Sequence, residues 1–125
     1  MNFNTDLYWN DSVLTKIEID RSNPGNQDTI VFEIDWYDLG PGKLVFNEVY
    51  LAKMNLNFGI VASECILNAF EADENDPDII DLYAKWKGML DKVELHGYVI
   101  NLNSSGSEIK ILAKSFEVTF DNMLL

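Results

Sequence analysis

Apolar and polar residues alternate along most of this chain, and a period of two residues predicts β-strands. In residues 13–20, Val13 and Ile17 share one parity, whereas Lys16 and Glu18 share the other. Such a segment fits a half-buried strand of an antiparallel sheet. The same alternation recurs in residues 29–36, 43–58 (one long strand or two collinear ones, with an interruption near Asn47–Glu48), 93–103 and 107–120.

Other stretches refine this picture. Residues 59–70 fit a helix or a strand, and a strand over 64–70 is favoured. Both faces of residues 93–103 are apolar, which predicts a position in the centre of the sheet. The apolar parity of residues 107–120 changes near Lys114–Ser115, which predicts a bulge or a bend there.

One segment departs from the alternation and predicts a helix over about residues 77–90. Asp76 is a favourable N-cap, Pro77 fits the first helical position, and Asp78 places negative charge near the positive end of the helix dipole. Apolar residues follow at helical spacing and predict one buried face, formed by Ile79, Leu82, Tyr83, Trp86, Met89 and Leu90.

Together these elements predict a single domain over residues 1–125 of the α+β class, mainly β. We expect an antiparallel meander of about six strands, with the helix inserted before the last hairpin and packed on one face of the sheet. The alternative is a β-sandwich with the inserted helix across its open end.

Charge narrows the range of partners. The chain has 125 residues, and its 9 basic and 21 acidic residues give a formal net charge of −12. Such a charge argues against binding to nucleic acid, because phosphate contacts require clusters of Lys and Arg, and against binding to anionic membrane surfaces. It favours a basic partner.

Cys65 is the only cysteine, so an intrachain disulfide is excluded. The first residues lack the basic and apolar regions of a signal peptide, and no apolar run reaches the length needed to span a membrane. A cytoplasmic location is therefore expected.

The sequence contains no recognisable catalytic, metal-binding or cofactor-binding motif. His96 is the only histidine, and neither His96 nor Cys65 lies in a local motif for nucleophilic catalysis. The acidic run 73–78 fails as an EF-hand loop because Asp78 and Ala84 occupy the positions of the required Gly and Glu. We therefore expect a protein without enzymatic activity, metal or cofactor.

Two segments carry a resemblance to a known class of protein. They are the opening Trp-Asn-Asp-Ser-Val-Leu-Thr-Lys-Ile-Glu-Ile-Asp of residues 9–20 and the Tyr-Val-Ile-Asn-Leu-Asn-Ser-Ser-Gly of residues 98–106. The chain resembles small, acidic, single-domain bacterial immunity proteins of polymorphic toxin systems and related uncharacterised families. The resemblance implies a protein that neutralises a cognate toxin by binding it, but the matching motifs are strand and turn residues that specify no site.

In such a protein, an acidic surface would bind a basic toxin domain through complementary charge. Trp36–Tyr37 adds an aromatic candidate, because consecutive residues of a strand cannot both face the core. The alternative is a β-module that binds a small ligand or carbohydrate through exposed aromatic residues. The sequence is also compatible with a homo-oligomer. The candidate partner contacts are Glu33, Asp35, Trp36, Tyr37, Asp73, Glu74 and Asp78.

Overall fold

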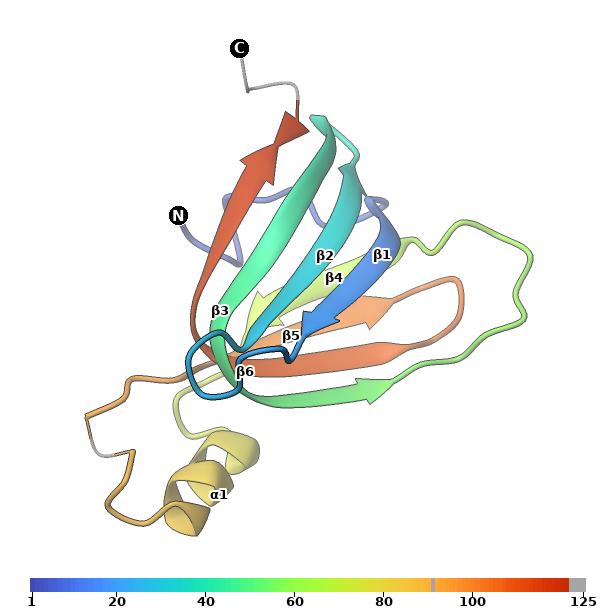
Figure 1. Ribbon diagram of the computed structural model, residues 1–125. Helices are drawn as coiled ribbons and strands as arrows, with labels where there is room; N and C mark the ends of the chain where they lie inside the picture. The colour runs from blue at the N-terminus through green and yellow to red at the C-terminus, as the bar shows by residue number, and fades with distance from the viewer. Residues whose placement is uncertain (91, 122–125) are drawn as a thin grey trace.

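The computed structural model describes residues 1–90 and 92–121, and Figure 1 shows their arrangement. These residues form one antiparallel sheet of six strands and a single α-helix, which confirms the predicted class, α+β and mainly β. The elements are β1 (Val13–Asp20), β2 (Thr29–Trp36), β3 (Gly40–Asn55), β4 (Ile66–Glu71), α1 (Pro77–Lys85), β5 (His96–Leu102) and β6 (Glu108–Phe120).

The strand order is β1-β2-β3-β6-β5-β4, so two three-stranded meanders join along β3 and β6. A simple meander would place β3 beside β4. Instead, β3 pairs with β6 from Gly42–Phe120 to Asn55–Glu108. The prediction that the fifth strand lies inside the sheet is confirmed, because β5 pairs with β6 on one side and with β4 on the other.

The two longest strands bend together, as Figure 1 shows for β3 and β6. Glu48 in β3 adopts a positive φ of 51°, and the β3–β6 register shifts between Val49 and Leu51. In β6, Ala113 and Phe116 both contact the main core although their parity differs. The predicted irregularity near Lys114–Ser115 is therefore a bend of β6, and the extra residue lies in its partner strand.

The bend curls the sheet until its two edges meet. Val13 of β1 forms an isolated antiparallel bridge with Cys65, just before β4. Hydrogen bonds from Leu14 N–H to the Glu64 carbonyl (2.9 Å) and from Ile66 N–H to the Ser12 carbonyl (2.8 Å) reinforce this contact. The curled sheet encloses a core that includes residues of all six strands and Phe3, Leu7 and Trp9 of the N-terminal segment.

Helix α1 packs on the outer face of the sheet, in a second apolar cluster formed by Ile79, Leu82, Leu90, Leu95 and Leu112. The Asp76 side chain caps it by accepting the Asp78 N–H at 3.0 Å, as predicted. The helix ends at Lys85 rather than near residue 90, because Gly88 takes a left-handed conformation (φ 81°) that turns the chain. Trp86 and Met89, predicted on the buried face, are 42% and 75% exposed.

No helix in the described part of the chain is long and apolar enough to cross a membrane.

Candidate functional site

The predicted acidic contacts do not form one surface. Glu33 of β2 is half-buried and lies in register with Lys16 of β1 on one side and with Lys43 of β3 on the other. Opposite charges on neighbouring strands stabilise each other. Glu33 is therefore half-buried with a lysine on each neighbouring strand, which makes it a weaker candidate contact for a basic partner than an exposed carboxylate.

Asp78 belongs to a network that holds α1 on the sheet. Its carboxylate accepts hydrogen bonds from Lys110 Nζ (2.6 Å) and Lys53 Nζ (2.5 Å), and Lys110 also binds Asp76 (2.7 Å). The Lys110 and Lys53 ammonium groups hold the pKa of Asp78 below its usual range. These contacts connect the helix N-terminus to β6 and β3, so Asp78 serves the fold.

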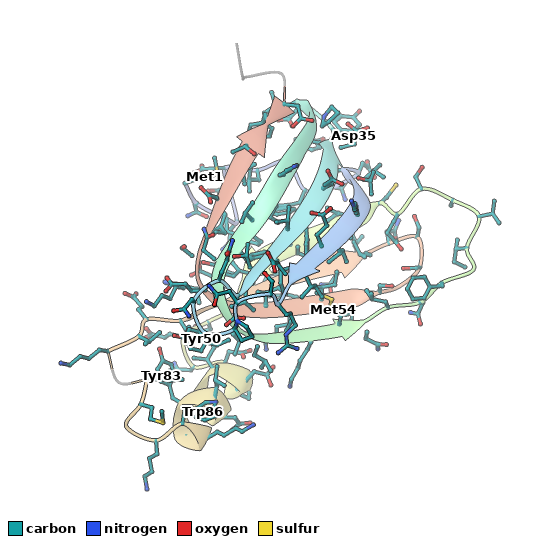
Figure 2. The ribbon with its side chains drawn as sticks, viewed as in Figure 1. Met1, Asp35, Tyr50, Met54, Tyr83 and Trp86 are labelled. Carbon is teal, nitrogen blue, oxygen red and sulfur yellow. The ribbon has the colours of Figure 1, made fainter. Side chains whose placement is uncertain are left out.

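Asp73 and Glu74 are exposed in the loop before α1, and one Asp73 oxygen accepts the Asn75 N–H at 2.8 Å. The structure brings neither of them to Asp35, which lies at the opposite end of the sheet from α1 in Figure 2. The predicted contacts therefore fall in separate regions, and Asp35 and Tyr37 are the pair that remains on one exposed segment.

Trp36 and Tyr37 face in opposite directions, as expected for consecutive strand residues. Trp36 is only 2% exposed and packs against Trp9 (ring centroids 5.0 Å apart) and Phe120 (6.0 Å), so its side chain belongs to the core. Tyr37 is 66% exposed and stacks on Tyr8, with ring centroids 5.1 Å apart and planes inclined by 16°.

A buried serine positions the two stacked tyrosines. The Ser12 hydroxyl donates to the Tyr8 carbonyl at 2.6 Å and accepts the Tyr37 N–H at 3.0 Å, and the residue is fully buried. Sequence reasoning missed Tyr8 and Ser12 as a unit with Tyr37. Nothing in the periodicity indicates that residues so far apart in the chain meet at one backbone junction.

Exposed carboxylates border this pair. Asp35 and Asp38 flank Tyr37 within two residues, and Asp11 immediately precedes Ser12. Within residues 1–90 and 92–121, none of these three carboxylates accepts a hydrogen bond or forms an ion pair. We call Tyr8, Tyr37, Asp11, Asp35 and Asp38 the tyrosine–aspartate patch. Aromatic faces and unpaired carboxylates both attract guanidinium and ammonium groups.

A groove lies at the other end of the molecule, between the sheet and the segment that follows α1. It has a volume of about 790 Å³, and Figure 2 shows Tyr50, Met54 and Trp86 in this region. We call it the α1 groove. Its walls are the end of β1 with the turn that follows, the second half of β3, and the segment after α1; they are formed by Ile19, Asp20, Arg21, Pro24, Asp28, Thr29, Ile30, Val49, Tyr50, Leu51, Ala52, Met54, Trp86, Met89 and Leu90.

The loop between β3 and β4 also carries exposed apolar side chains. Its stems are tied to the β5–β6 turn by bonds such as Asn57 N–H to Ser107 Oγ (2.9 Å) and Cys65 N–H to Ser104 Oγ (3.2 Å). Its tip presents Phe58 (85% exposed) and Val61 (102%) to solvent.

His96 and Cys65, the residues with the best-known nucleophilic or acid–base chemistry, are not joined by a hydrogen bond. His96 is the first residue of β5, with Nδ1 3.6 Å from Glu71 Oε2 and Nε2 3.7 Å from Glu94 Oε1. Cys65 lies elsewhere, where β1 meets the start of β4. Among the residues that the structure describes, no group of three or more His, Cys, Asp or Glu side chains is arranged to hold a metal ion.

No protein-family model matches this sequence, and no curated protein matches it.

Proposed function

We propose that this protein is a non-enzymatic binding module for a basic protein partner. The observation that carries the proposal is the tyrosine–aspartate patch, in which two exposed, stacked rings are bordered by carboxylates that have no partner among the described residues. In the particular case implied by the resemblance to immunity proteins, the partner is a cognate toxin domain, and binding would block its action.

The patch has the chemistry that such a partner requires. A guanidinium group can lie over a tyrosine ring while a neighbouring carboxylate accepts two of its hydrogen bonds. The Ser12 hydrogen bonds fix the backbone on which both rings sit, so little ordering is needed on binding. A net charge of −12 would also speed the encounter with a basic protein.

The proposed setting is the cytoplasm of a bacterium. This location is supported by Cys65, a free and half-buried thiol in a chain without disulfides, as is usual for proteins of reducing compartments.

A titration with the peptide acetyl-Gly-Arg-Gly-Arg-amide tests the patch before any partner is known. In NMR spectra of the labelled protein, the amide signals of Tyr8, Ser12 and Tyr37 should shift most. The double variant Asp35→Asn/Asp38→Asn should weaken binding by at least about threefold, the size of one exposed charge contact. Affinity should also fall with added salt, because exposed charges are screened over about 8 Å at physiological ionic strength.

The matched control is Asp81→Asn/Glu94→Gln, which removes the same two charges from exposed positions outside the patch. If both double variants weaken the peptide equally, net charge alone explains the binding and the patch is not a site. A neutral glycan that shifts the same amide signals, with no response to the arginine peptide, would replace the proposal by a carbohydrate-binding role.

The partner itself can then be sought in the organism's lysate. The immobilised protein should retain a basic protein at low salt, and the Asp35→Asn/Asp38→Asn variant should retain less of it than the control variant does. Equal retention by both variants would place the contact elsewhere.

A further inference from the structure

The α1 groove has an apolar floor and an open rim. Ile30 and Leu90 are buried at 3% and 7% exposure, whereas Trp86 and Met89 on the rim are 42% and 75% exposed. Its volume of about 790 Å³ lies in the range of small-molecule sites. The groove can therefore take an apolar chain that places one face on the floor and one end at the rim.

The rim carries cations in an otherwise acidic protein. Arg21, the single arginine of the sequence, lines the groove and is exposed. In the described part of the chain its guanidinium group has no hydrogen bond and no ion pair. Lys85 adds a second positive charge, with Nζ 5.6 Å from the centre of the Trp86 ring.

The two acidic residues of the groove lining are engaged in the β1–β2 turn. Asp20 accepts the N–H (2.9 Å) and the O–H (2.6 Å) of Ser22, and Asp28 accepts the Gly25 N–H (2.9 Å). These bonds direct both carboxylates toward the turn, so in the part of the chain that the structure describes, Arg21 is the charged residue of the lining without a partner.

We propose that the α1 groove binds an anionic amphiphile, a free medium-chain carboxylate whose apolar chain lies between β3 and the Trp86–Leu90 segment. The carboxylate meets the Arg21 guanidinium group, which matches its geometry with two parallel hydrogen bonds. This site is separate from the tyrosine–aspartate patch, and its ligand has the opposite charge to the partner proposed there.

The overall charge of the protein makes this proposal easy to test. A net charge of −12 favours a cationic amphiphile over an anionic one, unless the local charge of the groove decides. Dodecanoate and dodecyltrimethylammonium carry the same chain with opposite head groups. At concentrations below micelle formation, dodecanoate should bind saturably and at least about fivefold more tightly, the advantage expected of a charge-assisted contact.

Tryptophan fluorescence reports occupancy of the groove directly. Trp9 and Trp36 are 5% and 2% exposed, so Trp86 is the tryptophan whose surroundings change when the groove fills. Dodecanoate should shift the emission to shorter wavelength, and Trp86→Phe should remove the shift. Calorimetry then measures affinity independently of the fluorophore.

Two pairs of variants locate the site. Arg21→Gln should weaken dodecanoate binding by about fivefold, and Lys43→Gln, the same charge change near the start of β3 and outside the groove lining, should leave it nearly unchanged. Met89→Glu should weaken binding through repulsion on the rim, whereas Ile80→Glu adds the same charge on a part of α1 outside the groove. All four positions are surface-exposed, so the variants should fold.

The proposal is overturned if the cationic amphiphile binds as tightly as dodecanoate, or if Arg21→Gln and Lys43→Gln have equal effects. Binding without saturation, or an apolar peptide that fills the groove while dodecanoate does not, would also overturn it.

Discussion

The tyrosine–aspartate patch and the α1 groove occupy opposite ends of the molecule and differ in how they are built (Figure 2). The patch sits on the ends of β1 and β2, where a fully buried serine joins the two segments through hydrogen bonds. The groove lies where strand residues of the sheet meet the chain that follows a nine-residue helix, and this chain forms one of its walls.

The two regions differ in their local charge, which the net charge of −12 does not reveal. Carboxylates that pair with none of the residues in 1–90 and 92–121 flank Tyr37, whereas Lys53 and Lys110 bind Asp76 and Asp78. Arg21 and Lys85 remain beside the groove. A uniform charge of −12 would predict cationic ligands at both ends, but the local arrangement predicts opposite preferences.

The largest effect is expected from Leu82→Ala, which removes a buried side chain (7% exposed) from the small cluster beneath α1. Stability should fall by about 2–5 kcal/mol, as for other Leu→Ala changes in cores. In the protein that remains folded, the dodecanoate signal should be lost and the arginine-peptide response kept. Urea denaturation measures the first result, and Ile80→Ala, at a half-exposed helix position, is the control. Loss of both responses would show that the two ends are coupled.

Ser12→Ala tests the opposite end. It leaves the Tyr37 N–H without its acceptor, which should cost about 1–3 kcal/mol in unfolding free energy. The Tyr8–Tyr37 stack should loosen and the arginine-peptide affinity should fall, while the groove still binds dodecanoate. Thermal or urea unfolding and the two titrations provide the measurements. An unchanged peptide affinity would mean that the fixed backbone is not needed for the patch.

Acid should weaken the attachment of α1. Because Lys110 and then Lys53 lower the pKa of Asp78, its carboxylate adds stability that is fully present above the unfolded pKa, about 4, and is lost as the pH falls through the lower folded pKa. Lys110→Met should reduce the free energy of unfolding near neutral pH by about 1 kcal/mol. It should also make the loss of stability with falling pH less steep, because Asp78 loses its main partner.

Urea midpoints measured from about pH 6 down to about pH 2.5 would check this, because the stability contributed by Asp78 should begin to fall as the pH drops below the unfolded pKa of about 4. Lys87→Met, an exposed lysine outside the network, is the control for loss of a positive charge. The same acid decline in both variants would contradict the role given to Lys110.

The smallest effect is expected at the β3–β4 loop. Phe58→Ser/Val61→Ser alters side chains that are 85% and 102% exposed, so stability should change by less than about 0.5 kcal/mol per residue. The affinities for the arginine peptide and for dodecanoate should not change. A loss of partner retention from lysate by this variant would instead add the loop tip to the partner surface.

Much of the fold could be predicted from the sequence, because alternation over a whole strand is a strong local signal. The bounds predicted for β1 and β2 match the structure, and the N-cap at Asp76 is confirmed by its hydrogen bond. The predicted end of the helix is wrong because the helical spacing of apolar residues continues through Trp86 and across Gly88 to Met89. At that point, the conformation of a glycine outweighs the apolar pattern.

The candidate site was less predictable. Asp35 and Tyr37 were identified from the strand pattern and lie in the patch, but Trp36 is in the core. Glu33 and Asp78 lie among lysines from other strands. Sequence shows which side chains are charged, but not which opposite charges the fold places on neighbouring strands or, as for Asp78, within hydrogen-bonding distance.

The sequence by itself determined most of the strands, the capped helix, and an acidic chain with few cations, while residues 59–70 stayed open between helix and strand. Only the tertiary structure decided that β3 pairs with β6, that Ser12 joins Tyr8 to Tyr37, and that three separate segments enclose the α1 groove. The physical reason is the separation along the chain between the residues that interact. Periodicity and capping act over a few neighbouring residues, whereas pairing, stacking and ion pairs act between side chains that only the closed core brings together.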